Sequence, residues 1–292
     1  MQPRPLQTAA LTALAMVAFA SNSLLTRLAL AGRHIDAASF TLVRLVAGAL
    51  TLAVLVRLRH APRTQTPAQR ASFAGPLALF AYMAPFSFAY LRIGAALGAL
   101  VLFGTVQITM IFWGFVRGER SGRVTWLGLA LAVAGLAALT LPSASRPDAL
   151  GMVLMIAAGI AWGVYSLVGK TAAEPLAANA RSFLLGVPLA LILSAITLHD
   201  ATATTRGLTL AVTSGAITSA LGYAIWYRAL RGLTATRAAV VQLSVPVIAA
   251  SGAIAILDEA PNTRLVLSGA AVLLGVALAL IGRAPRASLG AR

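Results

Sequence analysis

The stretch Phe19-Ala20-Ser21-Asn22-Ser23-Leu24-Leu25-Thr26-Arg27 recurs in the second half of the chain as Trp162-Gly163-Val164-Tyr165-Ser166-Leu167-Val168-Gly169-Lys170. An aromatic residue, a serine, a leucine and a base occupy matching places in the two stretches. The sequence therefore predicts two copies of one hydrophobic pattern, each with five membrane-spanning helices. Because five is odd, the second copy must be inverted relative to the first, which is typical of many transporters.

The composition places this pattern in a membrane. Of the 292 residues 59% are hydrophobic and only 10% are charged, whereas soluble domains have about 25% charged residues. The net charge of +16 is spread over single bases between apolar runs, which argues against a nucleic-acid surface and fits the basic loops of membrane proteins. The absence of cysteine excludes disulfides and thiol catalysis. We expect an all-α integral membrane protein.

A helix that spans a bilayer needs about 20 mostly apolar residues. Short links separate the candidate spans, so no soluble domain fits between them. The spans predict a first repeat over 1–142, a second, inverted repeat over 143–282 and a disordered cytoplasmic tail over 283–292. The ten candidate spans are 7–30, 37–58, 71–91, 95–117, 123–141, 149–170, 177–198, 207–228, 235–257 and 264–282.

The bases also predict the orientation. They are concentrated in the links that share a side with the N-terminus, which places both termini in the cytoplasm by the positive-inside rule. We expect a multi-pass protein of the bacterial inner membrane. The apolar run after Arg4 also resembles a cleavable signal peptide, but its match in the second half of the chain favours a retained first span.

The repeated stretches, with Gly118-Glu119 in the first half and Asp258-Glu259 in the second, resemble the EamA-type transporters of the drug/metabolite transporter superfamily. This resemblance implies ten helices in two five-helix repeats, and among members it is closest to bacterial amino-acid and metabolite exporters. One departure is visible. The family often has a proline 13 residues before the glutamate that closes the fourth helix, and Pro246 fits this pattern where the first copy has Val106.

No acid or histidine lies in the middle of a predicted span; all seven acids and all three histidines fall in links or at span ends. Intramembrane acids and histidines are the usual proton relays of coupled transporters. We therefore expect facilitated diffusion or exchange without carboxylate-based proton coupling. The same absence argues against an enzyme, which needs clustered acids, bases or metal ligands, and we expect no metal site and no cofactor.

Polar and aromatic side chains line one face of the first and third spans of each copy, which predicts a cavity between the copies. Glutamines in the fourth spans add amide groups. The predicted substrate-binding residues are Asn22, Ser23, Tyr82, Phe86, Gln107, Trp162, Tyr165, Ser166, Tyr223 and Gln242, and the predicted hinges are Pro85 and Pro246.

Other intramembrane groups have simpler explanations. Arg44 and Arg181 lie one or two turns from a predicted span end, so we expect their long side chains to extend to the lipid headgroups or to pair structurally. Substrate contact is the alternative. Tyr90, Trp226 and Tyr227 adjoin bases, which is typical of the aromatic belt at the membrane interface.

Together these features predict a transporter that moves a small, net-neutral solute by alternating access through an uncharged aromatic and polar cavity. An amino acid, exported, fits best. A nucleotide-linked sugar, an organic cation or another metabolite remains an alternative solute. A membrane scaffold subunit that carries no solute is the alternative from another class. The expected partners are a small-molecule solute and the bilayer, without nucleic acid, and a monomer is plausible.

Overall fold

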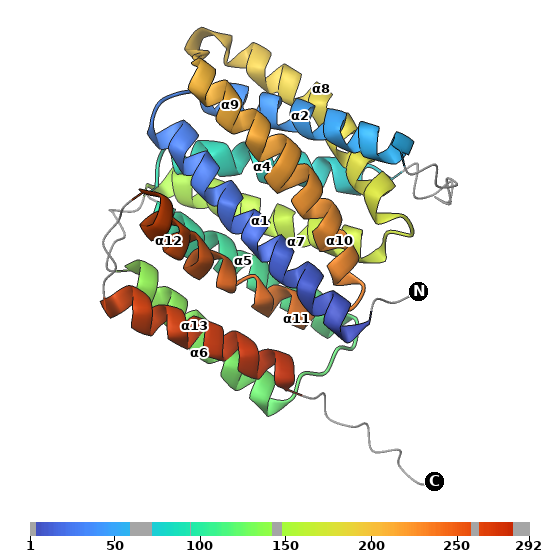
Figure 1. Cartoon of the computed structure of the whole chain (residues 1–292), viewed down its shortest axis with the longest axis vertical. Coiled ribbons are helices and arrows are strands. Elements are labelled where there is room, and N and C mark those ends of the chain that lie inside the picture. Colours follow the sequence, from blue (N-terminus) through green and yellow to red (C-terminus); the bar gives the residue numbers. More distant parts are fainter. Residues whose placement is uncertain (1–3, 59–71, 94, 142–147, 258–262, 283–292) are drawn as a thin grey trace.

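The computed structural model describes residues 4–58, 72–93, 95–141, 148–257 and 263–282. Within these ranges the chain forms helices joined by short turns (Figure 1). The helices are α1 (Pro5–Ala31), α2 (Ala37–Leu58), α4 (Ala74–Tyr90), α5 (Ala95–Val116), α6 (Arg123–Thr140), α7 (Ala149–Thr171), α8 (Pro175–Ile196), η2 (Leu198–Asp200), α9 (Thr205–Thr213), η3 (Ser214–Leu221), α10 (Gly222–Leu230), α11 (Ala235–Val241), α12 (Ser244–Leu257) and α13 (Thr263–Ile281).

Among the described residues, 9 helical segments are long and apolar enough to cross a membrane. The consecutive elements α9, η3 and α10 form one of these segments, and α11 with the first part of α12 forms another. The third predicted span corresponds to α4, which has 17 residues and lies at the short end of the range for transmembrane helices. The chain is therefore an all-α, multi-pass membrane protein.

Helices from the two halves of the chain pack against each other throughout the bundle (Figure 1). If each helix is replaced by its counterpart in the other half, every main pair becomes another observed pair. For example, α4 packs on α7 as α10 packs on α1. The packing therefore favours the predicted inverted repeats, which stay a prediction. The 142/143 boundary and the predicted tail over 283–292 lie outside the described residues. The main pairs are α1 with α10 and α12, α2 with α8 and η3, α4 with α7 and α8, α5 with α7 and α11, and α6 with α13.

Helices α6 and α13 approach each other closely, and this approach depends on two glycines. A Cβ atom on Gly128 would lie 2.5 Å from the carbonyl oxygen of Gly275, and one on Gly275 would lie 2.5 Å from that of Gly128. Small residues at membrane helix interfaces let the backbones approach closely. This pair lies at one edge of the bundle (Figure 1), away from the central helices.

The eighth span contains a π-helical segment, η3, between two α-helical turns. Within it Gly215 lies so close to α2 that a Cβ atom there would lie 2.2 Å from the carbonyl oxygen of Arg44. Asn179 of α8 donates its side-chain amide to the carbonyl oxygen of Ala220 at 3.0 Å. π-Helical turns are rare and frequently occur at functional sites, which directs attention to the side chains that η3 presents.

The ninth span is interrupted at Gln242 and Leu243, between α11 and α12. Pro246 explains the break, because proline cannot donate to the carbonyl four residues earlier and its ring clashes with that carbonyl in a continuous helix. The helix restarts at Ser244, so Pro246 sits in its first turn. Val106, the matching residue of the first half, lies within an uninterrupted α5.

Several hydrogen bonds lie where α1 begins and α13 ends, which we call the terminal side. Those of Glu119 join the two halves, and those of Lys170 and Arg231 join α7 and the α7–α8 turn to the α10–α11 turn within the second half. The carboxylate of Glu119 accepts hydrogen bonds from the backbone N–H groups of Ala235 (2.7 Å) and Thr236 (3.1 Å) at the start of α11. The ammonium of Lys170 at the end of α7 donates to the carbonyl oxygen of Leu233. Arg231 donates to the carbonyl oxygen of Ala172 at 2.9 Å. These bonds hold the terminal side together.

Candidate substrate cavity

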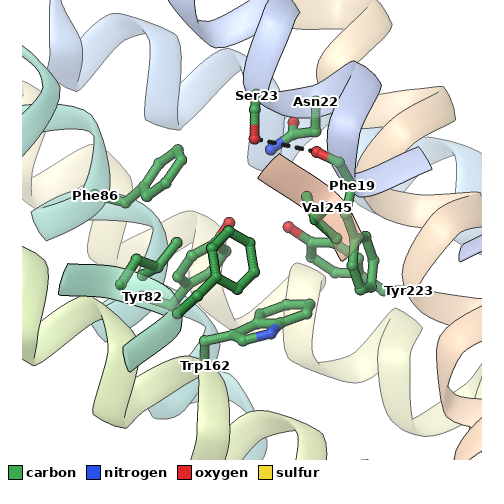
Figure 2. Close-up of a pocket in the computed structure, with 10 residues that line it drawn as sticks. Phe19, Asn22, Ser23, Tyr82, Phe86, Trp162, Tyr223 and Val245 are labelled. Atoms are coloured by element: carbon green, nitrogen blue, oxygen red, sulfur yellow. Dashed lines mark hydrogen bonds between the residues drawn. The ribbon is translucent and has the colours of Figure 1, made fainter. Parts of the chain in front are cut away.

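A small cavity lies between α1, α4, α5, α7, α10 and α12 (Figure 2). Aromatic rings form most of its wall, and the amide of Asn22 and the hydroxyl of Ser23 contribute polar groups from α1. The lining residues are Phe19, Asn22, Ser23, Tyr82, Phe86, Leu102, Phe103, Trp162, Tyr223 and Val245.

The aromatic rings pack directly on one another around Trp162. Its ring centroid lies 4.8 Å from those of Tyr82 and Tyr223 and 5.1 Å from that of Phe19, which meets it edge-on at 88°. These are the favoured spacings of aromatic pairs. The remaining cavity has a volume of about 20 Å³, room for a water molecule. The rings must therefore separate before a larger solute can enter.

The cavity lies in the half of the bundle opposite the terminal side. Asn22 and Ser23 lie toward the far end of α1, and Leu102 and Phe103 lie near the start of α5, which begins on that side. On the terminal side, by contrast, the bonds of Glu119 join α11 to the turn after α5. The structure thus combines a tied terminal side with a narrow cavity beyond it.

Asn22 connects the cavity wall to the π-helical segment. Its side-chain oxygen accepts hydrogen bonds from the hydroxyls of Ser214 at 2.7 Å and Thr218 at 3.2 Å. Both donors are uncharged and lie on η3. The polar end of the cavity is therefore built by α1 and the eighth span together.

The two predicted glutamines link helices at the level of Trp162. The indole N–H of Trp162 donates to the side-chain oxygen of Gln242 at 2.6 Å, and the amide of Gln242 donates to the carbonyl oxygen of Ala238. Gln107 donates to the carbonyl oxygen of Ala239 at 2.6 Å. The side-chain oxygen of Gln107 is buried and has no hydrogen-bond partner among the described residues.

The remaining predicted site residues do not line the cavity in this structure. Tyr165 and Ser166 are buried behind Trp162 on α7. The hydroxyl of Tyr165 donates to Asn179, and that of Ser166 accepts from the indole of Trp226 at 3.1 Å. They hold α7 against α8 and α10. The two predicted hinges differ in their helix geometry. Pro85 lies within the uninterrupted α4, whereas Pro246 follows the break in the ninth span.

Arg44 does not extend to the headgroups but pairs inside the bundle, which is the other part of the expectation for it. Its side chain is 0% exposed, and its guanidinium donates to the hydroxyls of Ser219 at 2.8 Å and Tyr223 at 2.6 Å. The guanidinium carbon lies 5.8 Å from the ring centroid of Tyr82. Contacts with η3 and two tyrosines thus hold it inside the bundle. Arg181 also pairs, but near the surface of the terminal side, where it donates to the carbonyl oxygen of Ser72.

The predicted aromatic belt is also wrong for Trp226 and Tyr227, which are both 0% exposed. Their polar atoms bond to α7 instead of to the interface, since the hydroxyl of Tyr227 donates to the carbonyl oxygen of Tyr165 at 3.0 Å. Proximity to Arg228 in sequence was misleading because α10 turns these rings inward.

Four lining residues were not among the predicted site residues: Phe19, Leu102, Phe103 and Val245. Phe19 lies three residues before Asn22 and so shares its helix face, a signal the sequence did contain. The three apolar residues of the fourth and ninth spans carry no local signal, because most residues of these spans are apolar.

A second hollow, of about 210 Å³, lies at the terminal side between α4, α7 and α8. Its wall includes Glu174, Arg181 and the α7–α8 turn. None of the predicted site residues borders it, so the cavity around Trp162 is the better candidate for solute binding.

Known proteins with similar sequences are transporters or uncharacterised proteins. The chain is 49% identical to the uncharacterised protein PA1977 of Pseudomonas aeruginosa over 97% of both chains. It is 31% identical to an uncharacterised transporter of Archaeoglobus fulgidus, covering 66% of this chain and 70% of that one. The uncharacterised transporter YwfM of Bacillus subtilis is 24% identical over 88% of each chain.

A solved crystal structure of a protein has the same fold, with a TM-score of 0.76, 18% identity and coverage of 92% of this chain and 98% of that one. The sequence profile of the EamA-like transporter family matches residues 149–281, which contain the second copy of the five-helix pattern. The relative from Archaeoglobus extends the match beyond this half. The chain therefore belongs to the EamA-like transporter family and is a multi-pass membrane transporter.

Proposed function

We propose that this transporter carries amino acids or closely similar net-neutral metabolites and exports them across the bacterial inner membrane. In this proposal both termini are cytoplasmic, and the cavity around Trp162 opens to each side in turn as helix bundles rock. The observation that carries the proposal is the mixed lining of this cavity. Aromatic rings adjoin a few amide and hydroxyl groups, and among the described residues no acidic side chain borders the cavity.

This lining suits a small solute with an apolar part and a few hydrogen-bonding groups. Stacked rings such as Phe19 and Trp162 offer apolar surface, and Asn22 and Ser23 offer hydrogen bonds at one end. Pockets for small molecules are typically built from apolar walls with a few placed polar groups. A solute whose positive and negative charges balance can enter such a site without a charged side chain in the cavity to neutralise it.

The proposed energy source is the solute gradient. The acidic residues lie at helix ends and in links and not inside the spans; Glu119, for example, lies beside the start of α11. No acidic or histidine side chain lines the described cavity, so the lining offers no carboxylate or imidazole that could pass a proton through it. Export would then follow the higher concentration of the solute in the cytoplasm.

The alternatives predict different chemistry. An organic cation would favour an acid in the cavity, and a nucleotide-linked sugar would favour several converging bases together with more volume. A scaffold subunit would tolerate loss of the aromatic wall. Solute flux therefore separates the two classes. A transporter carries solute and loses this flux in Tyr82→Ala or Trp162→Ala, whereas a scaffold carries none and tolerates both substitutions.

The test is flux in proteoliposomes with a panel of labelled amino acids, with and without an imposed pH gradient. We expect uptake of one or more neutral amino acids that does not depend steeply on the pH gradient. The Trp162→Ala variant should lose this flux. Absence of flux for the whole panel would exclude the amino-acid proposal, and a steep pH-gradient dependence would exclude uncoupled transport.

A further inference from the structure

Arg44 carries a positive charge in the middle of the bundle that no acidic side chain of the described residues balances. It lies about 10 Å along α2 from Ala37, at 1.5 Å per residue, and its side chain is 0% exposed. The ion pairs found in the described part of the chain join Arg92 to Asp148 and His199 to Asp200, both at the surface. The guanidinium of Arg44 instead donates to the neutral hydroxyls of Ser219 and Tyr223.

The guanidinium of Arg44 also has unused hydrogen-bonding capacity. Its Nε bonds to Ser219 and its Nη2 bonds to Tyr223, but its Nη1 is buried and has no partner among the described residues. Burial of a charge is costly unless it is paired and hydrogen-bonded, and buried polar atoms nearly always have a partner. An anion beside Nη1 would supply both the charge and the acceptor.

Arg44 lies directly behind the wall of the cavity. Tyr223 accepts its hydrogen bond, and the ring of Tyr82 lies 5.8 Å from its guanidinium carbon. Figure 2 shows these two tyrosines on opposite sides of the cavity, with Trp162 at its lower end. A solute larger than water must displace such rings, and any displacement of the tyrosines brings it next to the guanidinium.

We propose that Arg44 binds the carboxylate of the transported solute. This inference rests on the proposed function and adds the group that the site recognises. Guanidinium binds carboxylate in a two-point arrangement that an ammonium cannot match. The ammonium of a bound amino acid would then face the aromatic rings of the cavity wall, which attract cations.

A purely structural role for Arg44 makes a different prediction. In that case Arg44 serves only to hold α2 against η3 through Ser219. Removal of the serine hydroxyl would then impair the protein much as removal of the guanidinium does. If Arg44 binds carboxylate, the Ser219→Ala variant keeps the guanidinium and so keeps the preference for carboxylates.

The experiment compares four matched probes: leucine, leucinamide, 3-methylbutylamine and 4-methylpentanoate, which keep one apolar part and differ in their charged groups. Binding to the full chain in lipid nanodiscs is followed by tryptophan fluorescence, because Trp162 lines the cavity. Wild type should prefer leucine and 4-methylpentanoate. Arg44→Gln should weaken binding of these two by about 10- to 100-fold, the range for hydrogen bonds to charged groups, and leave leucinamide unchanged.

Three control variants keep the test decisive. Arg44→Lys preserves the charge without the fork, so it should give an intermediate loss even if Arg44→Gln fails to fold. Arg181→Gln removes another intramembrane arginine, one that does not line the cavity. This variant and Ser219→Ala should both keep the wild-type preference for the two carboxylate probes. If the Arg44 variants weaken all four probes alike, or if wild type binds neither carboxylate, the inference is wrong.

The outcome also separates this inference from the proposed function. If no amino acid is carried but 4-methylpentanoate binds in a manner that depends on Arg44, the amino-acid proposal falls and the anion site stands. If leucine is carried and Arg44→Gln leaves its advantage over leucinamide unchanged, the transport proposal stands and the anion site falls.

Discussion

Trp162 has two roles that can be separated at the level of single atoms. Its ring packs against Phe19, Tyr82 and Tyr223 in the cavity wall. Its indole N–H donates to the buried side-chain oxygen of Gln242. The first role concerns the shape of the cavity, and the second concerns the attachment of α7 to the break in the ninth span.

The Trp162→Phe substitution keeps a ring in the wall but leaves the side-chain oxygen of Gln242 without its indole donor. An unpaired buried polar atom costs about 1–3 kcal/mol, so we expect this loss in the free energy of unfolding. The Gln242→Leu variant should also be destabilised, because it leaves the indole N–H unpaired. The double variant should lose less than the sum of the two, since both partners are then apolar. Urea unfolding in micelles measures all three, and strict additivity would contradict the proposed pairing.

At this scale the sequence predicted residue types better than residue roles. The stripe on the first span drew attention to Asn22, and the stripe on the third to Tyr82, because helical spacing alone puts such residues on one face. Both line the cavity. The depth of Arg44 could not be predicted, since its burial depends on Ser219 and Tyr223, which lie far away in the chain. Long-range partners leave no mark on the local pattern.

Two irregular elements shape the interior of the bundle, and each sits in a span of the second half. The π-helical η3 presents Ser214, Thr218 and Ser219 to α1 and α2. The break before α12 places Gln242 against Trp162. Regular helices at these places would turn the same side chains in other directions.

The packing of η3 on α2 gives a prediction with a matched control. In Gly215→Ala the new Cβ atom would lie 2.2 Å from the carbonyl oxygen of Arg44, so the two helices must separate. Overpacking of this kind costs about 1–3 kcal/mol. Gly104 of α5 has nothing within 4 Å of the corresponding position, and Gly104→Ala should be neutral or stabilising because alanine favours helices. Melting temperatures in detergent should therefore fall for the first variant only. Equal melting temperatures would contradict the close contact.

Element boundaries were largely predictable because apolar length determines a span. The second predicted span, 37–58, coincides with α2, and the predicted 149–170 differs from α7 by one residue. The π-helical segment could not be predicted, because 207–228 contains no proline and has the apolar pattern of an ordinary span. The break in the ninth span did have a signal in Pro246, but proline indicates a disturbed helix without showing where it ends.

Over the whole molecule, hydrogen bonds join the two halves at both ends of the bundle. On the terminal side the carboxylate of Glu119 accepts from backbone N–H groups of the second half. On the opposite side the carboxylate of Asp36 accepts from the backbone N–H of Thr202 at 2.9 Å. The cavity lies between these two sets of bonds. Alternating access requires that such bonds break when the terminal side opens, so their strength sets the balance between conformations.

Glu119 is the best place to test this balance. It accepts two backbone hydrogen bonds at the start of α11, where the helix dipole also favours a negative charge. Loss of a capping group costs about 0.5–2 kcal/mol. In Glu119→Gln the closed terminal side should be weakened by roughly 1–2 kcal/mol, which multiplies the open population by about 5 to 30.

The distance between two spin labels measures this population. Because the chain has no cysteine, the labels can be attached to cysteines introduced at the exposed Arg117 and Arg228, and the distance between them can be measured in nanodiscs.

A second carboxylate provides the control for this measurement. Asp148 also caps a helix by accepting from Gly151 of α7, and it pairs with Arg92 at 3.4 Å. Both contacts lie on the opposite side of the bundle, so their loss does not open the terminal side. Asp148→Asn should therefore leave the distance between the labels unchanged, whereas Glu119→Gln should add a longer distance to the distribution. A single unchanged distance in the Glu119 variant would mean that this carboxylate stabilises α11 without holding the two halves together.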